Sequence, residues 1–123
     1  MVALATVTNP LPPQAAAIDM QHLARMTLGE QSLQREVLAL FDRQADVLLP
    51  RIRRGAPALA ASLAHTLKGS AVSIGAFEVA RAAESVEQVQ GRDDRDAAMA
   101  VAIERLAAVL DEARAEIARL IAA

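Results

Sequence analysis

His65 is the residue in this chain whose type and position most clearly offer chemistry. The segment around it has the apolar spacing of a single buried helical stripe. Its members are Leu59, Leu63, Leu67 and Ile74, with Ala60, Ala64 and Ala71 beside them. At about 100° per residue, His65 points roughly 165° away from the middle of that stripe, so we expect the ring to face solvent. An exposed imidazole can be protonated, can bind a metal ion, or can act as a nucleophile.

The residues one helical turn from His65 narrow this choice. Side chains three and four positions apart are neighbours on a helix, and here they are Ala61, Ser62, Lys68 and Gly69. Ala61 and Gly69 are small and leave the ring uncovered. Glycine inside a helix costs about 1 kcal/mol against alanine, so Gly69 indicates that another molecule must approach closely there. The positive charge of Lys68 disfavours a metal cation and suits an imidazole that carries an anion such as a phosphoryl group.

These residues resemble the phosphorylation motif of histidine-containing phosphotransfer (HPt) domains, which belong to bacterial multistep phosphorelays. The similar residues are His65-Thr66-Leu67-Lys68-Gly69-Ser70-Ala71, followed by Ile74-Gly75-Ala76. An H-x-L-K-G-S core with an apolar-Gly pair downstream is a specific signal. Similar residues also stand at Ile18-Asp19, in the Leu38–Phe41 region and from Glu84 to Glu87, so the resemblance covers roughly residues 18–121.

The resemblance implies a phosphotransfer module in which phospho-His65 relays a phosphoryl group between aspartates of receiver domains. The partners would be the receiver domains of a hybrid histidine kinase and of a response regulator. Lys68 would stabilise phosphoryl charge. Glu87 stands where similar domains place a Gln or Glu that accepts a hydrogen bond from Nδ1–H, which would leave Nε2 as the nucleophile. The residues expected to contact the partner are Ala61, Gly69 and Val72.

The residues present in the sequence also limit which cofactors we expect. Mg²⁺ is expected on the partner receiver domain, because this chain offers no clear metal cluster and no intrinsic cofactor is implied. A zinc site is disfavoured, because the only histidines, His22 and His65, lie on different predicted elements and there is no cysteine. His22 is best interpreted as surface or bundle edge. The chain has no Gly-rich phosphate loop, so it is not expected to be an ATP-using kinase itself.

Structural interpretations stay open beside the functional ones. Lys68 can be an ordinary solvated lysine, and Glu87 lies at the edge of an apolar stripe where a solvated glutamate is equally consistent. Glu84 is the neighbouring candidate for the Nδ1 partner. The Arg51, Arg53 and Arg54 cluster can favour a helix C-terminus or touch an acidic partner. For the whole chain, the alternative is a helical adaptor or inhibitor that binds a kinase or receiver domain without carrying phosphate.

The composition excludes several other classes of protein. The chain has 123 residues, a formal net charge of −2 and 54% hydrophobic residues, rich in the helix formers Ala and Leu. The charge argues against a general nucleic-acid surface, and the lack of cysteine excludes disulfides. No apolar run approaches the ~20 residues of a membrane span, and the N-terminus lacks the pattern of a signal peptide. We expect a cytoplasmic monomer.

Periodicity and turn residues predict an all-α fold, an antiparallel four-helix bundle with a short extra N-terminal helix. Residues 1–17 are expected to be a flexible tail and residues 18–123 the HPt-like bundle domain. The predicted helices cover about 20–27 after an Asp19 cap, 30–54 with a kink or break at Pro50, 57–73, 76–90 and a last helix to about 120. Gly75 should serve a turn, Gly91 should end the fourth helix, and Asp93 or Asp94 should cap the last. The tail and the starting Met suggest a freestanding protein, although a domain excised from a hybrid kinase would look similar.

Overall fold

The computed structural model describes residues 16–89 and 95–123, and within them the secondary structure is helical. The helices are α2 (Met20–Met26), α3 (Gln31–Arg54), α4 (Pro57–Ile74), α5 (Phe77–Val89) and α6 (Arg95–Ala122). The predicted tail lies almost wholly outside the described residues. So do Gly91, Asp93 and Asp94, the residues predicted to separate the last two helices.

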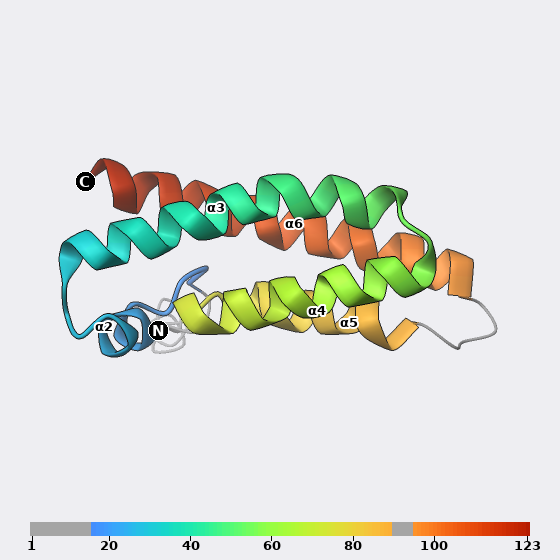
Figure 1. Ribbon diagram of the computed structural model, residues 1–123, viewed down its shortest axis with the longest axis horizontal. Coiled ribbons are helices and arrows are strands. Elements are labelled where there is room, and N and C mark those ends of the chain that lie inside the picture. Colours follow the sequence, from blue (N-terminus) through green and yellow to red (C-terminus); the bar gives the residue numbers. More distant parts are fainter. Residues whose placement is uncertain (1–15, 90–94) are drawn as a thin grey trace, which may run out of the picture.

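Helices α3 to α6 form an antiparallel bundle in which each helix runs opposite to the one before it (Figure 1). α4 and α6 each pack against both α3 and α5, so α4 and α6 lie diagonally across the bundle. The two-residue links at Gly55-Ala56 and Gly75-Ala76 leave the chain room only to turn back on itself. The short α2 covers the end of the bundle where α3 begins and α4 ends (Figure 1). The predicted four-helix bundle with a short leading helix is confirmed.

The buried face of α4 differs by one position from the predicted stripe. Its buried residues are Ala60, Ala61, Ala64, Leu67, Ala71 and Ile74. Leu59 is 44% exposed, so the prediction that it belongs to the buried stripe is wrong, whereas Leu63 is half-buried and packs against the core. Alanines instead lie where α4 approaches its neighbours, because small side chains let helix axes come close together. The exposed face that carries His65 is nevertheless on the side that the sequence predicts.

Pro50 does not divide the second long helix, which runs unbroken as α3 from Gln31 to Arg54. A proline in a helix removes one backbone hydrogen bond and crowds the preceding turn. Here Pro50 is exposed, so water can satisfy the freed carbonyl group. Leu48 and Ile52, on either side of it, are buried and hold both halves of the helix on the core. Core packing therefore outweighs the local cost of the proline.

The turn after α4 explains why Gly75 is a glycine. Gly75 has a left-handed φ of +84° and ends the helix by donating its N–H back to the last turn. Its carbonyl accepts a 2.9 Å hydrogen bond from the Asp19 amide, and a Cβ at this position would lie 2.8 Å from the Asp19 carbonyl oxygen. Asp19 also caps α2 by accepting from the His22 amide at 3.0 Å. Gly75 thus joins the end of α4 to the start of α2.

Two further predictions about surface residues can be compared with the structure. The half-buried His22 ring packs edge-on against Phe77 with centroids 5.1 Å apart, which is a bundle-edge position. In the basic cluster, Arg53 donates to Glu104 of α6 at 2.6 Å, while Arg51 and Arg54 are exposed. None of the helices described combines the length and the apolar character that crossing a bilayer requires.

Candidate functional site

His65 lies in the middle of α4 with 69% of its side chain exposed. Its neighbours Ala64 and Leu67 are fully buried, so the helix is anchored on the opposite side from the ring. A nucleophile on a packed helix has a backbone position that varies little, whereas one on a loop must be ordered on binding. The structure therefore presents an open imidazole from a rigid support.

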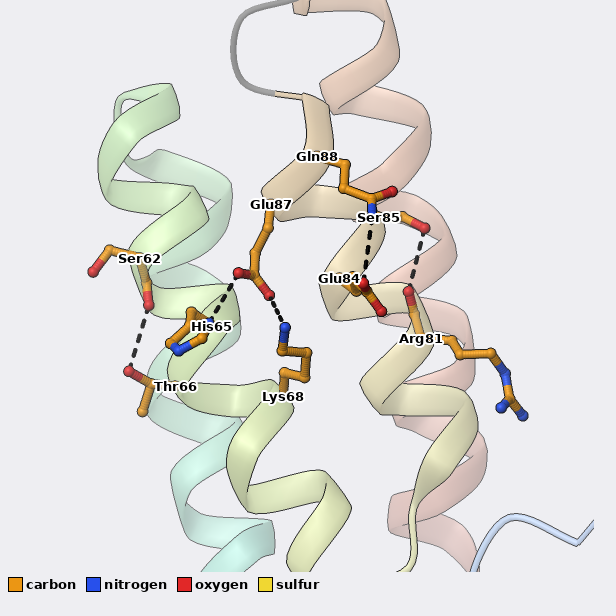
Figure 2. A network of polar contacts seen from close by, with 9 residues as sticks. All are labelled: Ser62, His65, Thr66, Lys68, Arg81, Glu84, Ser85, Glu87 and Gln88. Atoms are coloured by element: carbon orange, nitrogen blue, oxygen red, sulfur yellow. Dashed lines mark hydrogen bonds and ion pairs between the residues drawn. The ribbon is translucent and has the colours of Figure 1, made fainter.

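Glu87 of α5 reaches the imidazole from the neighbouring helix. Its Oε1 lies 2.9 Å from Nδ1 of His65, although the two residues are 22 positions apart (Figure 2). Only 22% of the Glu87 side chain is exposed, because Val86 beside it belongs to the core. The neighbouring candidate Glu84 is exposed and accepts a hydrogen bond from Gln88 at 3.3 Å instead. Of the two carboxylates, the structure brings Glu87 to the ring.

Lys68 binds the same carboxylate. Its Nζ lies 3.0 Å from Oε2 of Glu87, so Glu87 bridges Lys68 and His65 (Figure 2). The contact joins opposite charges and is an ion pair. Sequence reasoning placed both residues near His65 but missed that they pair with each other. The available signal was a glutamate at the edge of an apolar stripe, where a carboxylate needs a cation.

The charge state of Glu87 follows from these contacts. Partial burial would raise the pKa of the Glu87 carboxyl, but the contacts and charges of Lys68 and His65 outweigh it and hold the pKa below its usual value of 4.5. Glu87 is thus ionised near neutral pH and can only accept hydrogen bonds. Nδ1 of His65 must then be the donor, so in the neutral form of the ring the proton is on Nδ1 and the lone pair is on Nε2.

The surface around the ring is open at Gly69, one turn further along α4. A Cβ added to Gly69 would meet no atom within 4 Å, so the fold itself does not require a glycine here. Val72 is 43% exposed on the same helix. Ala61, by contrast, is only 8% exposed and packs into the bundle. Of the three residues expected to contact the partner, Gly69 and Val72 are accessible.

Comparison with known families agrees with this geometry. A family model described as the Hpt domain matches residues 20–121, which spans α2 and nearly all of the rest of the bundle. The chain belongs to the Hpt domain family. Hpt domains perform histidine phosphotransfer in phosphorelays and interact with receiver domains. Comparison with curated proteins and with solved structures finds no match.

The site of this Hpt domain combines an exposed imidazole with a carboxylate and a cation. Within residues 16–89 and 95–123, no group of three or more His, Asp or Glu side chains is placed to hold a metal. What the arrangement offers is an exposed imidazole whose Nδ1 faces a carboxylate, with a cation that balances that carboxylate. These are the requirements for an in-line attack on an electrophilic phosphorus atom.

Proposed function

We propose that Nε2 of His65 accepts a phosphoryl group from an aspartyl phosphate and later returns it to a different aspartate. The donor would be the receiver domain of a hybrid histidine kinase, and the final acceptor would be the receiver domain of a response regulator. The observation that carries this proposal is the 2.9 Å contact between Nδ1 of a 69%-exposed His65 and the ionised Glu87. That contact leaves Nε2 with its lone pair in solvent, where a partner can reach it.

The transfer balances without any proton moving. The lone pair of Nε2 attacks phosphorus while the bond from phosphorus to the aspartyl oxygen breaks, and the aspartate leaves as a carboxylate. The ring becomes an imidazolium that carries phosphorus on Nε2 and keeps its original proton on Nδ1. Glu87 then faces a positive ring across a charge-assisted hydrogen bond, which is stronger than the one before transfer. The reverse sequence delivers the phosphoryl group to the second receiver domain.

The partner supplies what this chain lacks. Mg²⁺ would come with the acidic site of the receiver domain, where it would offset phosphoryl charge during transfer. The receiver would approach over Gly69 and Val72, which are exposed on the same helix as His65. We place this encounter in the cytoplasm, between a monomeric Hpt domain and one receiver domain at a time. Because no nucleotide-binding loop is present in the sequence, the phosphoryl group must arrive already activated on the donor.

A radiolabelled transfer assay with purified receiver domains tests this function. The wild-type protein should gain acid-labile label from a phosphorylated receiver, and His65→Gln should gain none while keeping its helicity. His65 contributes little to the core, so loss of label with an intact circular dichroism spectrum would assign the role to the ring. Stable receiver binding without any label would instead favour the alternative, a helical adaptor that carries no phosphate.

A further inference from the structure

We propose that Lys68 is a positioning residue that acts on His65 through Glu87, rather than a cation that contacts the phosphoryl group, and this rests on the proposed phosphotransfer at His65. Its Nζ lies 3.0 Å from Oε2 of Glu87, and only 28% of the side chain is exposed. The ring nitrogen that does not contact Glu87 lies on the side of the imidazole away from Lys68 (Figure 2). The charge of Lys68 is thus directed at the carboxylate and not at the attacking atom.

The first effect of this contact is to fix the carboxylate. Oε1 of Glu87 faces Nδ1 of His65 and Oε2 faces Lys68, so both oxygens have a partner on α4. A glutamate side chain has three rotatable bonds, and losing one of two partners frees it to leave the ring. Lys68 therefore helps to hold the acceptor that keeps the proton on Nδ1. Partners that orient metal-binding histidines in a similar way commonly change affinity or activity by roughly 10- to 100-fold when removed, and we expect a loss of transfer at the lower end of that range here.

The second effect is charge balance. An unbalanced carboxylate beside an imidazole favours the imidazolium, in which Nε2 carries a proton and cannot attack. Lys68 offsets this charge while leaving Oε1 free to accept from Nδ1–H. Among the described residues, no second Lys or Arg pairs with Glu87, and the nearby Arg81 on α5 donates to Glu78. The oriented neutral ring thus depends on Lys68 for both the position and the charge of its acceptor.

A double-mutant cycle separates this role from direct contact with phosphate. Lys68→Met keeps the length of the side chain and removes its charge, and we expect the transfer rate to fall about 10-fold. Glu87→Gln replaces the carboxylate by an amide, whose oxygen can still accept a hydrogen bond from Nδ1–H but which carries no charge for Lys68 to balance. In the Glu87→Gln background, Lys68→Met should change the transfer rate by less than about 2-fold, because the carboxylate that Lys68 pairs with is absent. Arg119→Met on α6, which breaks the exposed pair with Glu116, is the matched control and should leave the rate unchanged.

A direct phosphate contact predicts a different pattern. In that case Lys68→Met would lower the transfer rate by the same factor in the wild-type background and in the Glu87→Gln background. This result would overturn the inference. The ¹⁵N chemical shifts of the His65 ring give a second readout in the unphosphorylated protein. Lys68→Met should reduce the population with the proton on Nδ1 alone, and adding Glu87→Gln should restore it. Unchanged ¹⁵N shifts in Lys68→Met would overturn this inference, and that measurement needs no phosphoryl transfer. Failure of the wild-type protein to accept a phosphoryl group would refute the proposed function instead.

Discussion

Gly69 gives a prediction in which stability and activity change in opposite directions. It lies inside α4, and a Cβ added there would meet no atom within 4 Å. Gly69→Ala should therefore gain the helix propensity of alanine, about 1 kcal/mol in the free energy of unfolding. For a bundle of this size, that gain corresponds to a rise of about 3–5 °C in Tm. The fold is thus expected to improve when this glycine is lost.

Phosphoryl transfer should respond in the opposite sense. Side chains on a helix lean toward its N-terminus, so a side chain at position 69 would lean over His65 one turn earlier. The two Cβ atoms would be about 5–6 Å apart, within the space that an approaching receiver domain needs. Gly69→Leu fills this space and should slow transfer by about 100-fold, because small misplacements of reacting groups have effects of that size. Gly69→Ala adds one methyl group and should slow transfer less.

Rapid-quench transfer from a phosphorylated receiver domain and thermal denaturation measure the two effects on the same proteins. Ala118→Leu, at an exposed position on α6 diagonally across the bundle, places a leucine side chain away from His65 and should transfer at the wild-type rate. Wild-type transfer in Gly69→Leu would refute the argument that an open face is required. A Gly69→Ala protein that is less stable than wild type would show that the glycine serves the fold.

Two other substitutions test the support of the site. Leu67 is fully buried directly behind the face that carries His65, so Leu67→Ala should lower the free energy of unfolding by about 2–5 kcal/mol in chemical denaturation, and an unchanged midpoint would contradict its place in the core. The pKa of Glu87 is lowered in the folded protein, so its contribution to stability is present above the unfolded value and is lost as pH falls through the folded value. The stability difference between wild type and Glu87→Gln should therefore shrink as pH falls from about 5 to about 3, whereas a difference independent of pH would contradict the ion-pair network.

The fold was largely predictable because its main signals are local. Helical periodicity, the Gly55–Pro57 turn and the short links define antiparallel helices without knowledge of their neighbours. The wrong predictions concern features that depend on packing between helices. Pro50 should break an isolated helix, yet buried residues on both sides of it keep α3 continuous. Leu59 is more apolar than Ala60, yet the alanine is 1% exposed and the leucine 44%, because the way α4 packs on its neighbours decides which side of the helix is buried.

In the candidate site, too, features of a single helix were predictable and contacts between helices were not. The exposure of His65 and the open space at Gly69 follow from one helix, and both were predictable from spacing along it. The position of Glu87 near the ring was expected only from the family resemblance, because the spacing of residues on one helix does not bring together two that are 22 positions apart. The Lys68–Glu87 ion pair was missed, since the face of Lys68 that meets α5 depends on how two helices pack.

The atom that carries phosphate is the most direct test of this account. The protein should be incubated with a phosphorylated receiver domain and Mg²⁺, and the product examined by ³¹P and ¹H–¹⁵N NMR. We expect one acid-labile phosphoryl group on Nε2 of His65, with the Nδ1 proton still hydrogen-bonded to Glu87. Phosphate on Nδ1 of His65, on His22 or on a hydroxyl side chain would contradict the assignment, as would a protein that binds the receiver domain and remains unphosphorylated.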